Sequence, residues 1–369
     1  MGKIGKRVAG DNKKCIKMKI CFLTHNINQN NGGGVFSSRL IKELQENLGA
    51  EAVVFTYPIN FFKLRRAVKE CDIVHALDVW PYAVLAYLAS FGLRKKKIIT
   101  AVGSAAILPL YNFWQAWITK RAYRAADKVI AISRFTKDEI IKKVPDLKIE
   151  VINPGVDYEK FNSERFSEQN VPMAQIFEQY KPYILSVGSL RWRKGYHRSI
   201  PAFAEVSKVF PDLKYVIVGK RYKDVYYERM EKLIRDFNLE GKVIILDKID
   251  DENALIRLYQ NAELFCLASQ TANRDLEGFG LVFLEAAAAG LSVVGTSGSG
   301  VEDAVSDRKN GILIPDPRDS KVFADAIIKI LSDANLKKSM SQASLDWARG
   351  FSWESKIAEY KKLYEHLFN

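Results

Sequence analysis

Cysteine and histidine are both scarce in this chain of 369 residues, with four of each. Cys15, Cys21, Cys71 and Cys266 are too few and too scattered for a disulfide framework, and no two of them form a CxxC pair. The four histidines include no pair with the spacing of metal ligands. We therefore expect a protein of a reducing compartment without a zinc site.

The chain also lacks a long apolar run. The longest, from about Trp80 to Leu93, is shorter than the roughly 20 residues that a membrane-spanning helix needs. The basic segment from Met1 to Lys19 has no apolar stretch of the signal-peptide kind. A cytoplasmic location is the expectation, and both Met1 and Met18 remain open as the start of the protein.

What the chain does have is the composition of a soluble globular protein, with 48% hydrophobic and 27% charged residues. Its length suggests two or three domains. Residues 1–180 hold 28 basic and 17 acidic residues, a net charge of +11, whereas residues 181–369 hold 28 and 26, a net charge of +2. This uneven distribution predicts an acidic partner for the front half: anionic lipid, nucleic acid or a phosphorylated substrate.

Short apolar segments alternate with helical patterns along the chain, which predicts an α/β fold with parallel sheets. The expected strands are 19–24, 52–56, 72–76, 97–101, 128–132 and 149–152, then 183–187, 214–218, 242–246, 264–267, 292–295 and 311–314. The polar segment 158–180 is expected to link two α/β domains of similar size. Thr136 and Glu139 have the spacing of a capping box that opens a helix. Ligands bind at the carboxyl ends of such strands, which places the site in the cleft between the domains.

A glycine-rich turn follows the first strand of each set. Segment 30–34 (NNGGG) joins the first strand to a helix, where glycines let backbone N–H groups approach a phosphate. Segment 188–195 (GSLRWRKG) repeats the arrangement and adds the cations Arg191, Arg193 and Lys194, which could hold a diphosphate. The alternatives are a flexible turn and a solvated basic loop.

The most specific pattern is segment 277–285 (EGFGLVFLE), in which two glutamates are separated by seven residues. Glu277 lies in a glycine-rich turn, where a carboxylate at a helix start can accept hydrogen bonds from sugar hydroxyls. Glu285 is expected about two helical turns further on, on nearly the same face. The alternative is that Glu285 is a solvated helix residue, which its apolar neighbours disfavour.

This element resembles the Glu-x7-Glu motif of the retaining, nucleotide-sugar-dependent glycosyltransferases of family four, also called glycosyl transferases group 1. These enzymes have the GT-B fold of two Rossmann-like domains. The resemblance extends over nearly the whole chain. Its other motifs, in the family's order, are the glycines 32–34, then 72–76 (DIVHA), 126–133 (ADKVIAIS), 153–157 (NPGVD), 187–188 (VG) with 194–195 (KG), 298–302 (GSGVE) with 310–311 (NG), and 351–353 (FSW).

The resemblance implies both the architecture and the donor site. The first Rossmann-like domain (18–178) would bind the acceptor and the second (179–352) the nucleotide sugar, with a C-terminal helix over 353–369 crossing back to the first. Glu277 would hold hydroxyls of the donor sugar, while Lys194 and Arg193 would neutralise the leaving diphosphate. The other implied donor contacts are Gly33, Gly34, Gly188, Arg191, the main chain of Gly278, Phe279, Gly280 and Leu281, Glu285 at the ribose, and the main chain near Lys248 and Ile249 at the base.

Two positions depart from the family pattern. Ser189 stands where the family commonly has arginine, so Arg191 or Arg193 would have to supply the second phosphate cation. Val102 stands where the family usually has a histidine near the donor sugar, which leaves open an unusual donor or reduced activity. The sequence has no Asp-x-Asp pair, so no Mg²⁺ site of the kind used by single-Rossmann transferases is expected. Lysine and arginine would do that electrostatic work without a cofactor.

Segment 107–124 mixes aromatic and basic side chains at helical spacing, among them Trp114, Trp117, Lys120, Arg121 and Arg124. A basic amphipathic helix with tryptophan can lie in a membrane interface. The alternative is an ordinary helix with both tryptophans buried against the first sheet. The first interpretation predicts reversible, salt-sensitive contact with the anionic inner face of the cell membrane.

We therefore expect a retaining, metal-independent glycosyltransferase, most simply a hexosyltransferase. It would move a sugar from a nucleotide-diphosphate sugar to a hydroxyl of a glycan or lipid-linked acceptor. Two alternatives stay open: a nucleotide-sugar epimerase or hydrolase on the same fold, and a non-catalytic basic protein that binds nucleic acid or membrane. RNA-binding modules present exposed aromatic residues on a sheet, a pattern that this sequence lacks, so no nucleic-acid partner is expected.

Overall fold

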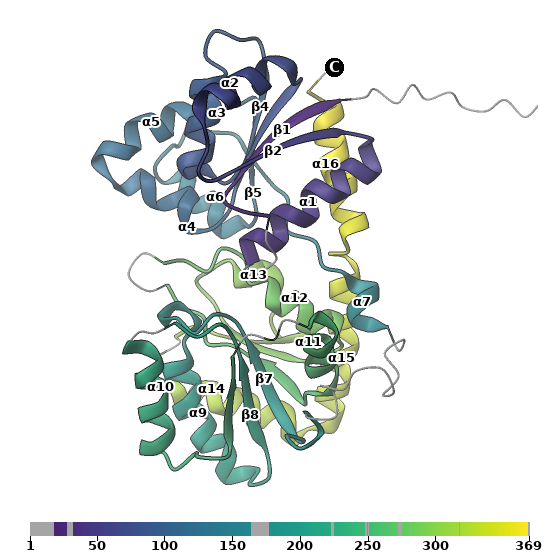
Figure 1. Cartoon of the computed structure of the whole chain (residues 1–369). Helices are drawn as coiled ribbons and strands as arrows, with labels where there is room; N and C mark the ends of the chain where they lie inside the picture. Colours follow the sequence, from purple (N-terminus) through teal and green to yellow (C-terminus); the bar gives the residue numbers. More distant parts are fainter. Residues whose placement is uncertain are drawn as a thin grey trace, which may run out of the picture.

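The chain forms two six-stranded parallel sheets, one in the upper and one in the lower part of the molecule (Figure 1). The computed structural model describes residues 18–27, 32–163, 177–222, 225–247, 249, 251–271, 275–316 and 318–367. Both sheets are wrapped by helices, which confirms the predicted α/β class. No helix within these ranges is long and apolar enough to cross a bilayer.

The upper part contains the first sheet, and its elements follow in chain order. They are β1 (Lys19–Thr24), α1 (Gly32–Leu48), β2 (Glu51–Thr56), α2 (Phe61–Glu70), β3 (Ile73–Leu77), the turn η1 (Val79–Ala83), α3 (Val84–Ala89), β4 (Lys96–Ala101), α4 (Ser104–Ile107), the turn η2 (Leu108–Tyr111), α5 (Phe113–Arg124), β5 (Lys128–Ala131), α6 (Arg134–Ile141) and β6 (Ile149–Val151).

The short helix α7 (Tyr158–Asn162) then leads toward the lower part. The elements of that part, with the returning last helix, are β7 (Tyr183–Val187), the turn η4 (Trp192–Lys194), α9 (Tyr196–Val209), β8 (Lys214–Val218), α10 (Val225–Asp236), β9 (Val243–Leu246), α11 (Glu252–Asn261), β10 (Leu264–Cys266), α12 (Leu281–Ala288), β11 (Val293–Thr296), α13 (Val301–Ala304), β12 (Gly311–Ile314), α14 (Ser320–Ser332), α15 (Ala334–Arg349) and α16 (Trp353–Glu365).

The first sheet is buried on both faces, because its strands are apolar at consecutive positions. In β1, Ile20 and Phe22 belong to the core under α1 and α16, whereas Cys21 and Leu23 belong to the core under α2, α3 and α5. Side chains alternate between the two faces of a strand, so a strand covered on both sides needs apolar residues throughout.

The order of the strands indicates where each sheet can bind a ligand. The first sheet has the order β2-β1-β3-β4-β5-β6 and the second β12-β11-β10-β7-β8-β9. The order therefore changes direction between β1 and β3 in the first sheet, and between β7 and β10 in the second. Loops that leave two strands at such a switch point diverge and open a crevice, where ligands bind in doubly wound sheets.

Three local details differ from the sequence predictions. Helix α1 begins at Gly32, so the glycines form its first turn instead of preceding it. The apolar segment 81–91 is expected from the sequence to form one helix, but it begins within the turn η1, and α3 starts only at Val84. Helix α6 begins at Arg134 and not after Thr136, because Ser133 is the cap: its Oγ accepts the N–H of Thr136 at 3.0 Å.

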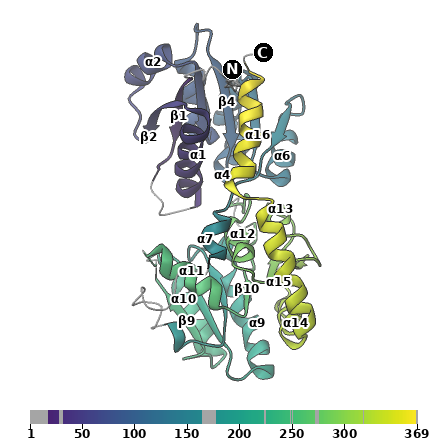
Figure 2. The same cartoon turned by 90° about the vertical axis from the view of Figure 1, so that its right-hand side faces the viewer.

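The chain crosses between the two parts twice, and the two crossings lie side by side. The N–H of Val156 donates to the carbonyl of Phe351 at 2.8 Å, and Val156 also pairs with Ser352. Both views show α7 and α16 on this one side of the molecule (Figures 1 and 2). The polar link expected over 158–180 therefore starts with a helix, α7, and residues 164–176 lie outside the described ranges.

Helix α16 lies against the first sheet although it ends the chain. Its first residue, Trp353, stacks on Phe36 of α1, with 6.2 Å between the ring centres. Near its end, the hydroxyl of Tyr364 lies 2.6 Å from Nδ1 of His75, whose Nε2 lies 2.8 Å from Oγ1 of Thr100. His75 is fully buried, and burial lowers its pKa to about 3. This histidine therefore ties α16 to the sheet as a neutral group.

Candidate active site

A cavity of about 880 Å³ lies between the carboxyl ends of the two sheets. Its upper wall comes from the loops after β1, β3 and β4, and its lower wall from the loops after β7, β8 and β10. The two switch points thus face each other across the cavity. Its volume is in the range of cavities that enclose a small organic ligand.

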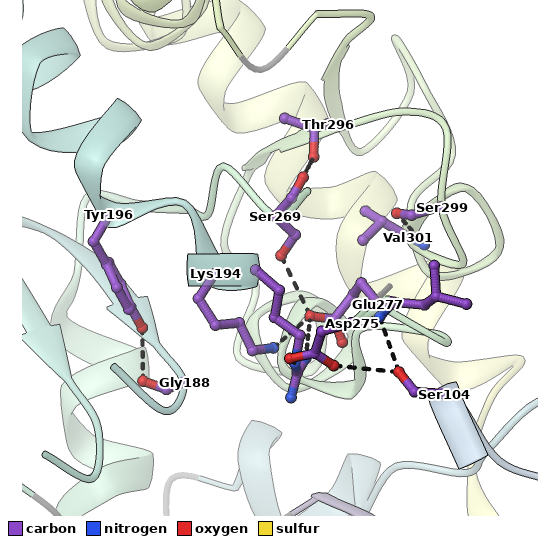
Figure 3. Close-up of polar contacts among 12 residues, drawn as sticks. Ser104, Gly188, Lys194, Tyr196, Ser269, Asp275, Glu277, Thr296, Ser299 and Val301 are labelled. Atoms are coloured by element: carbon purple, nitrogen blue, oxygen red, sulfur yellow. Dashed lines mark hydrogen bonds and ion pairs between the residues drawn. The ribbon is translucent and has the colours of Figure 1, made fainter. Parts of the chain in front are cut away.

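Glu277 is the centre of a buried charge cluster in the lower wall (Figure 3). Its Oε2 accepts from Nζ of Lys194 at 2.6 Å, from Nη1 of Arg193 at 2.9 Å and from Oγ of Ser269 at 3.5 Å. Arg193 also reaches Asp275, with 3.1 Å between Nε and Oδ2. Two cations and two carboxylates are therefore packed together where the loops after β7 and β10 meet.

Burial and neighbouring opposite charges shift the pKa values of this cluster in opposite directions. The side chains of Glu277 and Lys194 are each 8% exposed. Burial alone would raise the pKa of Glu277, but Lys194 and Arg193 outweigh it and hold that pKa below its usual range. Burial lowers the pKa of Lys194, and the nearby Arg193 adds to this effect against the attraction of Glu277. The carboxylate is thus held ionised in a largely dry site, where its charge acts strongly.

Backbone geometry explains why glycines flank Lys194. Gly195 has a φ of 71°, and a Cβ built there would lie 1.7 Å from the carbonyl oxygen of Ala268. At Gly188 a Cβ would meet the side chain of Lys194 at 3.1 Å, and the carbonyl of Gly188 accepts from the hydroxyl of Tyr196 at 2.7 Å. A side chain at position 195 would collide with the loop after β10, so glycine is required for Lys194 to reach Glu277.

Glu285 also lines the cavity, from the middle of α12. Its Oε2 accepts from the hydroxyl of Tyr259 at 2.8 Å, and burial raises its pKa to about 7. It is therefore not a solvated helix residue. Glu277 precedes α12 and Glu285 lies within it, so the expectation that helical spacing puts both glutamates on nearly the same face is wrong. The two residues line one cavity from the turn and from the helix.

The other predicted donor residues line the same cavity. Gly33 and Gly34 approach it from the start of α1, Gly188 and Arg191 from the loop after β7, and Ile249 from the loop after β9. The guanidinium of Arg191 lies over the ring of Tyr222, 4.3 Å from its centre. Arg193 instead pairs with Glu277. Of the two arginines that could replace the family's arginine at position 189, only Arg193 therefore belongs to the Glu277 cluster. Lys248 lies outside the described residues.

The turn from Gly278 to Leu281 is held by the upper part of the molecule. The carbonyl of Gly278 accepts from Oγ of Ser133 at 2.7 Å, and a Cβ at Gly278 would lie 2.8 Å from Cα of Gly103. Phe279, Gly280 and Leu281 all line the cavity at the start of α12, and the ring of Phe279 is buried. The absence of a side chain at Gly278 therefore lets the two parts approach closely, a contact that the motif did not predict.

Two further contacts join the lower part to the upper part, one at the loop after β10 and one at α13. Ser104 accepts the N–H of Leu276 at 2.9 Å and donates from Oγ to Asp275 at 3.2 Å (Figure 3). Arg134 donates from its N–H and its guanidinium to Asp303 at 2.6 and 2.5 Å. The position of Glu277 is thus linked to the upper part through residues on both sides of it.

The upper wall contains residues that sequence reasoning missed. Asp78 follows β3 with a φ of 129° and accepts the N–H of Val79 at 2.8 Å, and burial raises its pKa to about 8. His25 follows β1, and its Nδ1 lies 3.0 Å from the hydroxyl of Tyr82. Val102 lies beside them in the wall. Asp78 and His25 stand directly after neighbouring strands, so the rule about carboxyl ends could have identified both.

Some residues of the motifs are structural. His75 is enclosed under α16, as described above, and does not line the cavity. Glu302 accepts the N–H of Gly298 at 2.8 Å and so closes the turn before α13. Among the described residues there is no group of three or more histidine, cysteine, aspartate or glutamate side chains that could hold a metal ion.

Comparison with known families decides the identity. Residues 48–160 match the model of "Glycosyltransferase Family 4", and residues 170–347 match "Glycosyl transferases group 1". The chain belongs to the group 1 glycosyltransferases. The resemblance inferred from the motifs is therefore confirmed, and so is the enzyme class, since membership favours a transferase over a non-catalytic binding protein.

Curated relatives of this glycosyltransferase carry related names. A "GDP-mannose-dependent alpha-(1-6)-phosphatidylinositol monomannoside mannosyltransferase" of Mycolicibacterium smegmatis is 28% identical over 317 residues, which are 82% of this chain and 78% of that protein. A "D-inositol 3-phosphate glycosyltransferase" of Corynebacterium urealyticum is 33% identical over 226 residues, which are 60% of this chain and 51% of that protein.

Solved structures confirm the GT-B fold of this glycosyltransferase. Sucrose-phosphate synthase from Thermosynechococcus elongatus matches with a TM-score of 0.79 at 20% identity, over 95% of this chain and 99% of that chain. The HepE protein of Anabaena, solved in complex with UDP-glucose, matches with a TM-score of 0.76 at 21% identity over the same shares of the two chains.

Proposed function

We propose that this glycosyltransferase transfers a hexose from a nucleotide-diphosphate sugar to an acceptor hydroxyl, with retention of configuration and without a metal ion. The observation that carries the proposal is the buried Glu277–Lys194–Arg193 cluster in a cavity between two facing switch points. A carboxylate suits sugar hydroxyls, and fixed cations suit a departing diphosphate.

The walls of the cavity suggest how the donor lies. The diphosphate would rest between Lys194 and Arg191 of the lower wall and the start of α1 at Gly33 and Gly34. Helix N-termini favour phosphate because the helix dipole is positive there. Glu285 would accept from the ribose hydroxyls, and Ile249 would lie beside the base.

The names of the relatives support a nucleotide-sugar donor. One relative is named for GDP-mannose, and the Anabaena neighbour holds UDP-glucose. The mannosyltransferase is also named for an acceptor that is a phosphatidylinositol glycoside, which favours a lipid-linked acceptor here over a free glycan. With such an acceptor, the enzyme would work at the inner face of the cell membrane.

The reaction would proceed on one face of the sugar. The bond from the anomeric carbon to the diphosphate oxygen breaks, the bond to the acceptor oxygen forms on the same face, and the acceptor proton passes to the departing phosphate. Asp78 faces the cavity from the acceptor side. Its pKa of about 8 keeps it largely protonated at neutral pH, so it would donate a hydrogen bond to the acceptor instead of removing its proton.

A thermal-shift screen of UDP-, GDP- and ADP-sugars tests the donor proposal first. A ligand at 100 times its Kd should add about 2.7 kcal/mol to the free energy of unfolding. One nucleotide series should stabilise the protein, and the same shift should be lost in Lys194→Ala. If no nucleotide sugar changes the melting temperature at saturating concentration, the proposed donor class is wrong.

The donor found in this way then identifies the reaction. Transfer to a lipid or glycan acceptor should give a product whose anomeric coupling in NMR matches that of the donor. A product of the opposite configuration would contradict retention. Release of free sugar, or of an epimer, with every acceptor tested would instead identify a hydrolase or an epimerase on this fold.

A further inference from the structure

One face of the upper part carries exposed aromatic rings beside basic side chains. We propose that this face, formed around α5 and extended by α2 and α3, docks on an anionic lipid bilayer. The proposal rests on the proposed function only in that a lipid-linked acceptor gives the contact its purpose. We call the exposed side chains Phe113, Trp114, Trp117 and Arg121, with the adjacent Lys120, the α5 ridge.

The rings of the α5 ridge are directed to solvent. Phe113 is 83% exposed, Trp114 85% and Trp117 61%, whereas Thr119, Ala122 and Tyr123 form the buried face of the same helix. The tryptophans are therefore not packed against the sheet, and that alternative is wrong. Large exposed aromatic clusters are rare on monomeric proteins and mark contact surfaces. Tryptophan is favoured at the membrane interface, where one end of its ring system is apolar and the other is wet.

Positively charged side chains lie beside these rings, as contact with an anionic bilayer surface requires. The guanidinium of Arg121 lies over the ring of Trp117, 4.1 Å from its centre, one helical turn further along α5. The sequence of α5 has three basic residues and no acidic one. Apolar rings can enter the boundary between headgroups and acyl chains while adjacent cations meet the phosphates. This complementarity favours an anionic bilayer over an apolar protein groove.

Helices α2 and α3 extend the same surface. They cover the same face of the first sheet as α5, and α3 packs against both neighbours. Phe62 of α2 is 82% exposed and Phe91, just after α3, is 70% exposed. Residues 61–70 and 91–97 together hold eight lysines and arginines and one glutamate. A broad basic field thus surrounds the α5 ridge, as attraction to an anionic surface needs.

The position of the α5 ridge suits an acceptor that stays in the membrane. The chain runs from Gly103 and Ser104, in the cavity wall, through α4 and η2 directly into α5. Figure 1 shows α5 on the side of the upper part away from α7 and α16, which connect the two parts. A bilayer against α5 would therefore lie on the side of the molecule opposite the two chain crossings.

Vesicle co-sedimentation of the full-length protein tests the proposal. Phosphatidylcholine vesicles with added phosphatidylglycerol should bind the protein, pure phosphatidylcholine vesicles should bind it much less, and salt should weaken the binding. Lys120→Gln with Arg121→Gln should weaken binding about 25-fold, since each cation near an anionic surface contributes about fivefold, or ~1 kcal/mol. Trp114→Ser with Trp117→Ser should remove most of the remaining affinity. Arg124 is left intact because it pairs with Asp146.

A matched control changes exposed residues of the lower part. Phe237 is exposed and Lys208 belongs to an exposed pair with Glu205, so Phe237→Ser with Lys208→Gln should leave vesicle binding unchanged. All variants should melt within a few degrees of the wild type and keep the donor-induced thermal shift. If the donor shift fails while vesicle binding holds, the proposed function falls and the membrane proposal stands.

Three results would overturn the proposal. The wild type could bind neutral and anionic vesicles equally, or neither. The tryptophan variant could bind like the wild type. Sedimentation velocity could show a dimer that Trp114→Ser with Trp117→Ser dissociates, in which case a second copy of the chain, and not lipid, covers the α5 ridge.

Discussion

Lys194 and Glu277 form a buried ion pair of 2.6 Å between residues that stand 83 positions apart in the chain. One follows β7 and the other follows β10, the two strands at which the order of the second sheet changes direction. Arg193 and Asp275 complete the group. A strong charge is thus held in place before any substrate arrives, which is the condition under which electrostatic catalysis is efficient.

Replacing Glu277 by glutamine should impair both catalysis and stability. A hydrogen bond to a charged group contributes roughly 1.5–3 kcal/mol, so kcat/KM should fall about 10- to 150-fold. The free energy of unfolding should fall as well, since Lys194 and Arg193 lose the carboxylate that balances them. Glu205→Gln, in an exposed pair with Lys208, is the matched control and should change neither quantity. Wild-type kcat/KM in Glu277→Gln would remove Glu277 from the site.

Lys194 and Arg191 should differ in their effects. Lys194→Ala should lower kcat by roughly 100- to 1000-fold, because a preorganised charge opposite the leaving diphosphate is lost. Arg191 stacks on Tyr222 at the surface, so Arg191→Ala should raise the KM for the donor with a much smaller change in kcat. Steady-state kinetics with varied donor separate the two. Equal losses of kcat in both variants would contradict this division.

Ser104 should matter for turnover although it belongs to the opposite wall. Its hydroxyl binds both Asp275 and the N–H of Leu276, so Ser104→Ala should lower kcat about fivefold, the value of one hydrogen bond of about 1 kcal/mol. Ser104→Thr should restore most of the rate, and Ser355→Ala, on the exposed face of α16, should have no effect. An unchanged kcat in Ser104→Ala would show that the contact does not position the loop.

Donor affinity should depend on pH through Glu285. Burial raises its pKa to about 7 from a usual value of 4.5, so the protonated form stabilises the fold below 4.5 and this contribution is lost as the pH rises through 7. If ribose hydroxyls donate to the ionised carboxylate, donor affinity should instead increase as the pH rises through 7. Calorimetric titrations on both sides of this value measure it, and Glu285→Gln should flatten the profile. An identical profile in the variant would contradict the assignment.

Activity should survive removal of divalent metal. The cavity presents Lys194, Arg191 and Arg193 to the donor, and these cations would stabilise the leaving diphosphate. Assays in excess EDTA should therefore give the same kcat as untreated enzyme. Activity that disappears in EDTA and returns with Mg²⁺ or Mn²⁺ would contradict the metal-independent mechanism.

The sequence predicted the fold well because local signals carry it. All twelve expected strands are present, and their bounds shift by at most a residue at either end, since apolar runs between turns leave little choice of position. The helix starts at α1 and α6 were less predictable. The three glycines 32–34 predicted a loop, although they begin α1. The capping hydroxyl of α6 belongs to Ser133, three positions before the expected Thr136.

The candidate site was predictable where a motif carried it and not where two distant loops meet. The motif residues Glu277, Lys194 and Glu285 all line the cavity. The place of Asp78 after a strand was predictable, but its burial and raised pKa depend on neighbouring elements. The pairing of Arg193 with Asp275, and of Ser133 with Gly278, depends on how the loops pack in space, which no local pattern encodes.

The two chain crossings, joined at Val156 and Phe351, set the direction in which the cleft can open. Two adjacent connections at one edge would act as a hinge. The two parts could rotate about that edge, whereas rotation about the long axis would be resisted. The hydrogen bonds of Ser104 and Ser133 to the lower part would hold the cleft closed and would break when the two parts rotate apart. An acceptor would enter on the far side from α7 and α16, and on that side Figure 1 places α5.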